Sequence, residues 1–432
     1  MVDAIHMKLT KFLIVLLLIL FPFGQLTRIP LAISGVTLYF QDLIITALLF
    51  WWLVNHLLKK KPFLKPLLRL PIFAFMGISL FSLLINFGNL EVFELLISFL
   101  YFLRWSTHAG IYFVTYEITK NKKQKTDNIL KSLAASGVLT GVFGLIQYFL
   151  YPNLRNLYYL GWDPHQYRAF GTFLDPGFLG IILVLTLILL LCFKTLKKWI
   201  RLSGILVVFL TLLLTYSRSS YLALAIAMIV LAWLKRNLKI LLIPVLILFF
   251  AVGISILPCQ PSEGVKLERT STISARLENY QQSLKIIKDN LFFGVGFNSL
   301  RFVKRDYGFL NQDWQKSHSG AGIDSSLLFV LTTTGVIGLG IYLCIYFLPV
   351  ILNLLRPASN GMGIQNLYRS RDQACLPADR LGITKKSESL NILITTSIIA
   401  LLIHSFFLNS LFYPWVMVWM WVILGVNHSE SK

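Results

Sequence analysis

The chain has 432 residues, of which 56% are hydrophobic and only 14% are charged, and its mean hydropathy is +0.70. An ordinary soluble domain carries roughly a quarter charged residues, so this composition excludes a single water-soluble core and a disordered chain. The net charge of +21 lies in short clusters between apolar runs, which is typical of membrane orientation and not of a nucleic-acid-binding groove.

Apolar runs between polar breaks predict an all-α, polytopic membrane protein with about twelve transmembrane helices and a large outer-face loop. The first run follows Lys8 and Lys11 like a signal peptide, but no cleavage site of small residues follows it, so we expect it to remain a span. The expected spans are residues 12–27, 31–57, 68–88, 91–118, 130–151, 176–194, 200–215, 220–234, 239–257, 323–354, 388–409 and 412–427.

Lysine and arginine clusters predict the orientation of these spans. With a cytoplasmic N-terminus, the alternate loops that fall inside carry the basic clusters, whereas the short outer connections almost lack them. The positive-inside rule then predicts a bacterial plasma-membrane protein with both termini in the cytoplasm. Anionic lipid of the inner leaflet accounts for the basic charge, so we expect membrane lipid and no nucleic acid as a partner.

Two longer segments fall on the outer side. Residues 258–322 form a polar segment of 65 residues, and an amphipathic helix is expected at 274–290. Such a helix lies on a membrane surface or caps a cavity. The other outer segment, residues 152–175, carries Trp162, His165, Tyr167 and Arg168.

These segments divide the chain into three regions. Residues 1–151 form N-terminal transmembrane helices, and residues 152–354 form a core region with both outer loops. Residues 355–432 supply a cytoplasmic loop and the last two helices, and we expect the loop at 356–387 to be polar and irregular.

The four cysteines predict no redox or metal framework. Cys192 and Cys344 lie in apolar runs, whereas Cys259 and Cys375 lie in polar segments expected on opposite sides of the membrane. Their spacing fits no zinc motif. We therefore expect neither a disulfide framework nor a metal site, and no cofactor.

Arg218 is the strongest candidate for an anion-binding residue. It lies in a polar turn between two strongly apolar runs, TYSRSS at residues 215–220. The alternative is an arginine that snorkels to lipid headgroups, although short outer connections otherwise avoid cations. A planar guanidinium makes bidentate contacts to phosphate that lysine cannot reproduce. We therefore predict an anion cradle in which Ser217, Ser219 and Ser220 supply further donors.

Three further residues are candidates for chemistry in or beside the long outer segment. His318 is a candidate general base in a polar loop. Asp324 begins an apolar run, so it is either a base or an ordinary first-turn acid that complements the helix dipole. Arg276 lies near the start of the amphipathic helix, where a solvated surface charge is the alternative. The residues alone leave these alternatives open.

Five ionisable residues interrupt the apolar runs. Such groups normally face the protein interior and find partners. An ion pair of Arg104 with Asp42 or Glu94 is the structural interpretation, and a proton relay or ion-coupled transport is the functional one. The five residues are Asp42, Glu94, Arg104, His108 and His404.

Four motifs, taken in order, resemble those of the O-antigen ligase and O-antigen polymerase superfamily. They are YRAFGTF with DPG at 167–177, TYSRSS at 215–220, SARL with NLFFGVG at 274–296, and DSSLL with TGVIG at 324–338. Each motif is short, but their common order and topology make the set specific. The resemblance covers about residues 160–345, and the flanking spans match only in number and hydrophobicity.

The resemblance implies a metal-independent glycosyltransferase with an active site at the outer leaflet. It implies a donor glycan on a polyprenyl diphosphate such as undecaprenyl diphosphate, and an acceptor sugar hydroxyl on lipid A core or on a growing glycan. By position, Arg218 and Arg276 would hold the diphosphate, and Arg168 would assist. Fixed guanidinium groups stabilise the negative charge that such a leaving group gains.

Asp324 departs from the ligase pattern, because ligases of this superfamily carry histidine at the corresponding position. Counting back from Gly335 places Asp324 there, with His318 six residues earlier. Aspartate is more usual there among polymerase-like members, and a carboxylate can deprotonate the acceptor hydroxyl. We therefore expect a polymerase, with Asp324 or His318 as the base, and keep a ligase as the alternative.

A flippase or other transporter of lipid-linked saccharide is the rival from a different class, since about twelve spans suit many carriers. Inverted repeats and helices broken within the membrane would favour it, and the sequence shows neither. A peptidoglycan-type polymerase is a second rival, with similar topology and donor chemistry.

Overall fold

The computed structural model describes residues 2–29, 36–58, 65–120, 123–193, 196–256, 271–310, 322–355 and 378–427. Within these residues, seven helices are long and apolar enough to cross a membrane, and four shorter helices are also apolar. One two-stranded sheet accompanies them. The predicted all-α polytopic membrane fold is therefore confirmed.

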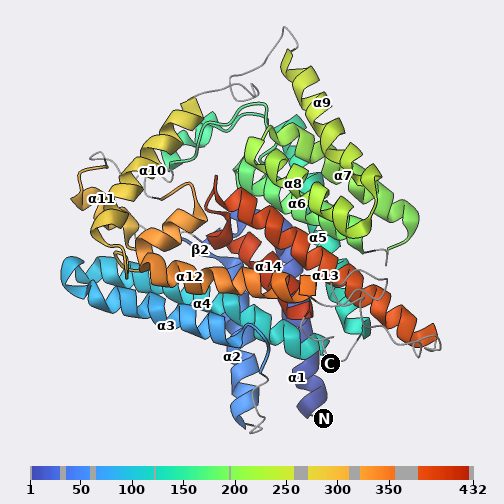
Figure 1. Ribbon diagram of the computed structural model, residues 1–432, viewed down its shortest axis with the longest axis horizontal. Helices are drawn as coiled ribbons and strands as arrows, with labels where there is room; N and C mark the ends of the chain where they lie inside the picture. The colour runs from blue at the N-terminus through green and yellow to red at the C-terminus, as the bar shows by residue number, and fades with distance from the viewer. Residues whose placement is uncertain are drawn as a thin grey trace.

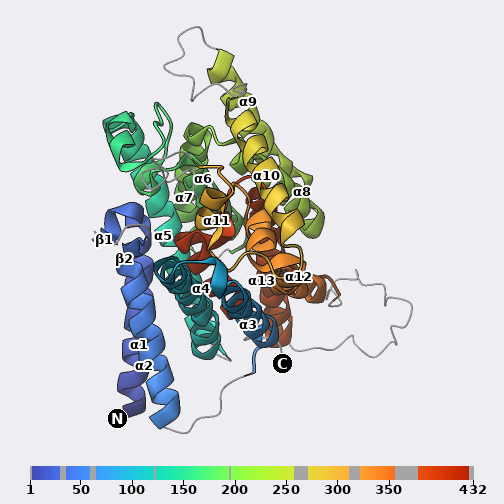
Figure 2. The same cartoon turned by 90° about the vertical axis from the view of Figure 1, so that its left-hand side faces the viewer.

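The N-terminal elements form an upright pair of helices beside a second, crossing pair (Figures 1 and 2). Helix α1 packs along α2, and α3 packs along α4. The short antiparallel strands β1 and β2 join Arg28 to Tyr39 above the upright pair. The elements are α1 (Val2–Leu20), η1 (Phe21–Thr27), β1 (Arg28–Ile29), β2 (Leu38–Tyr39), α2 (Phe40–Leu58), α3 (Arg69–Ile85), η2 (Phe87–Asn89), α4 (Val92–Thr119) and α5 (Lys123–Leu150).

Helix α6 (Pro176–Cys192) lies at the centre of the molecule. It is apolar on every side, and nearly all of its side chains are buried against α5, α7, α8 and α13, as expected for a helix without a polar face. Small residues allow close approach, because a Cβ on Gly180 would lie 2.2 Å from Ser220 Oγ on α8. The neighbouring elements are η3 (Arg155–Leu160), η4 (Gly171–Phe173), α7 (Lys198–Thr215), α8 (Arg218–Lys235), η5 (Leu238–Leu241) and α9 (Leu242–Ile256).

The C-terminal elements close the molecule around this centre. Helix α13 packs on α6 and α8, α14 packs on α4, and α12 crosses α3 (Figure 1). The predicted amphipathic helix is present as α10. The elements are α10 (Ser271–Asp289), α11 (Leu300–Asp306), α12 (Ser326–Leu355), α13 (Ala378–Ser405), η10 (Ser410–Phe412) and α14 (Pro414–Asn427).

Three predicted boundaries were wrong. The span expected at 31–57 begins only at Phe40, because residues 38–39 form β2 and the Asp42 carboxylate accepts a hydrogen bond from the Tyr39 amide (3.0 Å). The loop expected to be irregular over 356–387 is helical from Ala378. The span expected to reach residue 409 ends at Ser405, where a turn follows.

Helix α12 is broken at Gly335, which the sequence analysis did not foresee. Gly335 has φ 70° and ψ −173°, so the helical hydrogen bonds around it are interrupted. The loop after α10 fills the break: the amide of Val295 donates to Thr332 O (3.0 Å) and the amide of Gly296 donates to Thr333 O (3.1 Å). The helix carbonyls are thus satisfied by backbone amides, as buried polar groups require.

Most of the ionisable groups within the apolar runs are paired. Arg104 Nη2 lies 2.8 Å from Asp42 Oδ2, which confirms one of the two predicted ion pairs. Glu94 instead pairs with Arg305 of α11, at 2.5 Å between Oε1 and Nη1. The buried His108 lies 3.8 Å from Asp42. These contacts neutralise charge inside the fold.

Candidate active site

The turn between α7 and α8 positions Arg218. Tyr216 adopts a left-handed φ of 48°, and Ser217 caps the first turn of α8. The buried side chain of Arg168 fixes this turn, because its Nε donates to Thr215 O (2.9 Å) and its Nη2 donates to Tyr216 O (3.2 Å). Arg218 therefore begins α8 from a backbone that a second arginine holds in place.

The serines beside Arg218 are turned into the protein. Ser217, Ser219 and Ser220 are buried, and the Ser217 and Ser220 hydroxyls lie 2.8 Å apart. Nε2 of His404, on α13, lies 3.3 Å from the hydroxyls of both Ser219 and Ser220. The hydroxyls of Ser219 and Ser220 thereby join α8 to α13, and their role as donors to an anion stays a prediction.

Helix α10 brings Arg276 to Asp324. Arg276 Nε lies 3.8 Å from Asp324 Oδ2, and the two side chains are 27% and 43% exposed. One turn further along α10, the Tyr280 hydroxyl contacts the carbonyl oxygens of Asp324 (3.2 Å) and Phe406. Desolvation by the surrounding protein raises the pKa of Asp324, and the Arg276 charge opposes this rise. A carboxylate with a raised pKa is a stronger base.

Lys304 lies behind Asp324 as a buried cation. Its Nζ donates to Gly322 O (2.8 Å) and lies 3.4 Å from Asn279 Oδ1. Burial lowers the pKa of Lys304 to about 8, and the Asp324 charge opposes this change. The lysine thereby ties α11 to α10 and to the segment that leads into α12.

The loop before α6 adds two carboxylates and a histidine. Asp175 caps α6 by accepting hydrogen bonds from the amides of Gly177 (2.6 Å) and Phe178 (2.9 Å). His165 Nε2 lies 4.0 Å from Asp175 Oδ2. Desolvation, together with the charges of Asp175 and Asp324, raises the pKa of Asp163 to about 6.

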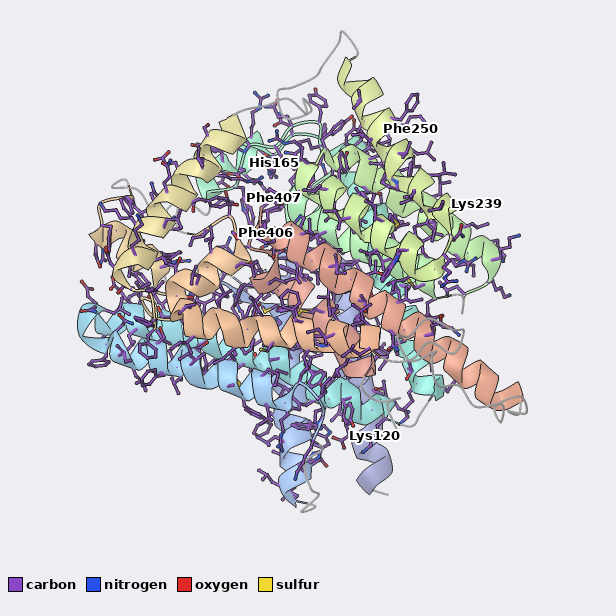
Figure 3. The ribbon with its side chains drawn as sticks, in the orientation of Figure 1. Lys120, His165, Lys239, Phe250, Phe406 and Phe407 are labelled. Atoms are coloured by element: carbon purple, nitrogen blue, oxygen red, sulfur yellow. The ribbon has the colours of Figure 1, made fainter. Side chains whose placement is uncertain are left out.

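Charges on these segments act on one another. The Asp324 charge raises the pKa of Asp163, the Arg168 charge lowers it, and Arg218 lies within reach of the Arg276 charge. In the view of Figure 3, His165, Phe407 and Phe406 appear one below another in the upper middle of the molecule, with α10 to one side. Lys120 and Lys239 lie toward other edges of the same view. The Tyr280 hydroxyl bonds to Phe406 O, so α10 meets the segment that follows α13.

The structure brings together four of the five predicted site residues, Arg168, Arg218, Arg276 and Asp324. His318 lies outside the described residues, as do Cys259 and Cys375. The sequence analysis missed Asp163 and Lys304 as parts of the site. Asp163 follows Trp162 in the segment at 152–175, and its place in that segment was the only feature of the sequence that pointed to it.

The arrangement suits an anionic ligand beside a base. Arg218 and Arg276 repel each other electrostatically, and an anion between them relieves that repulsion. Asp324 supplies a carboxylate that is reachable from solvent next to these cations. Among the described residues, no three histidine, cysteine, aspartate or glutamate side chains are grouped so that they could hold a metal ion.

Comparison with known families identifies one region of the chain. Residues 204–343 match the family model for O-antigen ligase. This range includes Arg218, Arg276 and Asp324, whereas Arg168 and His404 lie outside it. No curated protein matches the chain. The family match confirms the predicted resemblance over residues 204–343, which hold three of the four motifs, whereas the motif at 167–177 lies before them.

Proposed function

Since residues 204–343 carry an O-antigen ligase family domain within a polytopic membrane protein, we propose that this chain is a glycosyltransferase of the bacterial plasma membrane. It moves or polymerises glycan from a polyprenyl-diphosphate-linked donor at the outer face. The observation that carries the proposal is the meeting of Arg276 and Asp324, 3.8 Å apart, with Arg218 at the start of α8 within reach of the Arg276 charge.

Arg218 and Arg276 bind the donor diphosphate in this proposal. Breaking the bond between the sugar and the diphosphate leaves negative charge on the departing diphosphate. Guanidinium groups that are already in place stabilise this charge without reorganising. Arg168 acts through the turn that it holds, so we assign it as a positioning residue instead of a direct ligand.

Asp324 is the proposed general base. The acceptor hydroxyl oxygen attacks the anomeric carbon of the donor sugar, and its proton passes to the Asp324 carboxylate. The diphosphate leaves with the electron pair of the broken glycosidic bond. The raised pKa of Asp324 supports this role, because it brings the basicity of the carboxylate closer to neutral pH.

We infer a polymerase in preference to a ligase, because aspartate occupies the position where ligases of the superfamily carry histidine. Ligation of a glycan to lipid A core or to another acceptor remains the alternative. The broken helix α12 is a feature that transporters also use. In this chain the backbone amides of Val295 and Gly296 bond to the carbonyl oxygens that the break leaves free. The broken helix therefore does not favour a flippase.

The deciding experiment supplies the purified protein, in nanodiscs, with a labelled polyprenyl-diphosphate oligosaccharide and no metal or nucleotide. We expect a ladder of lengthened lipid-linked chains on a gel. A single transfer that requires lipid A core would instead identify a ligase. Transport of the intact donor across a vesicle membrane without any new glycosidic bond would contradict the proposal.

Two substitutions test the assigned roles. Arg218→Lys keeps the charge but loses the planar fork, and we expect turnover to fall about 100-fold. Arg155→Lys, in the same outer region, is the matched control and keeps wild-type turnover. Near-normal turnover of Arg218→Lys would remove this residue from the diphosphate site.

Asp324→Asn removes the base while keeping the side-chain shape, and we expect about a 100- to 10,000-fold loss of turnover. Asp289→Asn, at the end of α10, is its control. Full activity of Asp324→Asn would return Asp324 to the role of a helix-start acid and would make His318 the candidate base.

A further inference from the structure

A partly open cavity of about 220 Å³ is lined in part by the segment that joins α13 to α14. Its walls come from β2, α4, α12, α14 and the loop after Gly296, so widely separated parts of the chain build it. No family motif discussed above assigns it a ligand. Six of its aromatic side chains are Tyr39, Tyr101, Trp105, Phe297, Phe329 and Phe412.

The cavity also contains polar groups that are suited to hydroxyls. Asn298 and Asn409 line it, and within the described residues Nδ2 of Asn298 and Oδ1 of Asn409 are buried without a hydrogen-bond partner. Asn298 has a left-handed φ of 60°, a conformation that asparagine tolerates better than most residues. Arg104 also lines the cavity, with its guanidinium 5.0 Å from the Tyr101 ring centre and its charge balanced by Asp42.

This combination fits a sugar ring better than the other candidate occupants. A pyranose has apolar C–H faces, which pack on aromatic rings, and a rim of hydroxyls, which amides bind. An isoprenoid chain would leave the amides of Asn298 and Asn409 without partners. An anion would have to compete with Asp42, which already pairs with Arg104.

The cavity is linked directly to the proposed base. Ser326, two residues after Asp324, bonds to both sides of Asn409, because its Oγ donates to Leu408 O (3.3 Å) and accepts from Leu411 N (3.0 Å). The same segment begins at Phe406, whose carbonyl oxygen contacts Tyr280 of α10. The segment that bonds to Ser326 and to Tyr280 therefore also supplies part of the cavity wall.

We propose that this cavity is a subsite for a pyranose ring of the acceptor glycan. The assignment of the cavity to the acceptor glycan rests on the proposed glycosyl transfer. Sugar binding itself needs no transfer reaction. The ring in the cavity anchors the acceptor so that a neighbouring sugar presents its hydroxyl to Asp324.

The test measures binding first. Saturation-transfer NMR follows methyl glycosides of glucose, galactose, rhamnose and N-acetylglucosamine with the full chain in nanodiscs and without donor. We expect transfer to at least one glycoside, because packing of the C–H face is common to all of them. Asn298→Gly keeps the left-handed backbone, and Asn409→Ala removes the second amide. Each should weaken the binding of that glycoside about fivefold.

Asn353→Ala is the matched control. Asn353 lies at the far end of α12, and its Nδ2 also has no hydrogen-bond partner among the described residues. It should bind the glycosides as the wild type does. Equal binding by all variants, or no saturation transfer to any glycoside, would overturn the subsite. Saturation transfer only to geraniol, a short isoprenoid alcohol, would assign the cavity to a lipid chain and overturn it as well.

Transfer kinetics then separate the two proposals. With donor present, Asn298→Gly and Asn409→Ala should raise the acceptor KM by about fivefold and leave the donor KM at its wild-type value. If the wild type binds glycosides but makes no glycosidic bond, the transferase proposal fails while sugar binding stands. If the wild type transfers glycan and both variants keep its acceptor KM, the subsite fails alone.

Discussion

Arg168 shows how one buried side chain can control a neighbouring functional group. Its guanidinium holds the carbonyl oxygens of Thr215 and Tyr216, and the next residues begin α8 with Arg218. A hydrogen bond from a charged donor contributes about 1.5–3 kcal/mol. The arginine therefore fixes the turn without needing to touch the ligand itself.

This arrangement makes a prediction for Arg168→Lys. Lysine keeps the positive charge but cannot bond both carbonyls in the same fork geometry. We expect kcat to fall about 10- to 100-fold, while the donor KM changes little. Steady-state kinetics measure both. A variant that raises the donor KM and keeps kcat would place Arg168 in direct contact with the diphosphate.

The charges around Asp324 predict opposite pH shifts in two variants. Asp175 disfavours ionisation of Asp324, whereas Lys304 favours it. Asp175→Asn should therefore lower the pKa of Asp324 and move the acid limb of kcat/KM toward lower pH. Lys304→Gln should raise that pKa and move the limb toward higher pH. The pH profiles of kcat/KM test the pair, and shifts in the same direction would contradict this electrostatic account.

Sequence analysis was most successful where a polar residue stands alone among apolar ones. Arg218 and Asp324 could be singled out because each stands at the edge of an apolar run, and the family motifs added Arg276 and gave the three an order. Lys304 could not, because it lies among other charges in the long outer segment, and only the tertiary fold buries it. The contact of the serines near Arg218 with His404 could not be predicted, because sequence does not show which way a hydroxyl points.

At the scale of elements, the break in α12 and the loop that fills it act as one unit. Gly294 and Gly335 both have positive φ, and a Cβ on Gly335 would lie 2.1 Å from Phe292 O. The Ser82 hydroxyl of α3 contacts the carbonyl oxygens of Phe293 (2.6 Å) and Thr333 (2.7 Å). The glycine-valine-glycine motif is therefore explained by backbone packing.

Gly335→Ala should strongly destabilise the protein. The new methyl group collides with backbone and must adopt an unfavourable φ, so we expect a loss of roughly 3 kcal/mol in the free energy of unfolding. Gly340→Ala, on the same helix with no atom within 4 Å of its Cβ position, is the control and should stay near wild type. Thermal unfolding in detergent measures the difference, and equal unfolding temperatures would contradict it.

Element types were easier to predict than interruptions within them. Long apolar runs predicted the membrane helices, because each run has the length and composition of a span. The run at 323–354 reads as one continuous helix, since Gly335 alone does not distinguish a break from ordinary close packing. The break depends on Val295 and Gly296, about forty residues earlier in the chain.

At the scale of the whole molecule, the arrangement of the ends agrees with the predicted orientation. Helix α1 begins and α14 ends on the same side of the molecule (Figures 1 and 2). Helix α10 lies away from that side in both views. The predicted cytoplasmic location of both termini follows from the basic clusters and stays a prediction.

Cysteine labelling in whole cells tests this orientation. In a variant without the four native cysteines, His165→Cys should react with a membrane-impermeant maleimide added outside. Lys239→Cys should react only after the cells are permeabilised, because it lies in a basic cluster predicted to be cytoplasmic. The reverse labelling pattern would place the site on the cytoplasmic side.

Residues that lie far apart in the sequence build the site, and this affects how the protein is synthesised. His404 bonds to the serines of α8 only after α13 has left the ribosome, whereas Arg168 emerges far earlier. At usual rates of synthesis these two events are roughly 10–50 s apart. During this period the arginines of the site are already in the membrane, but α13, which carries His404, has not yet been made. Co-translational insertion therefore delays activity until almost the whole polypeptide has been translated.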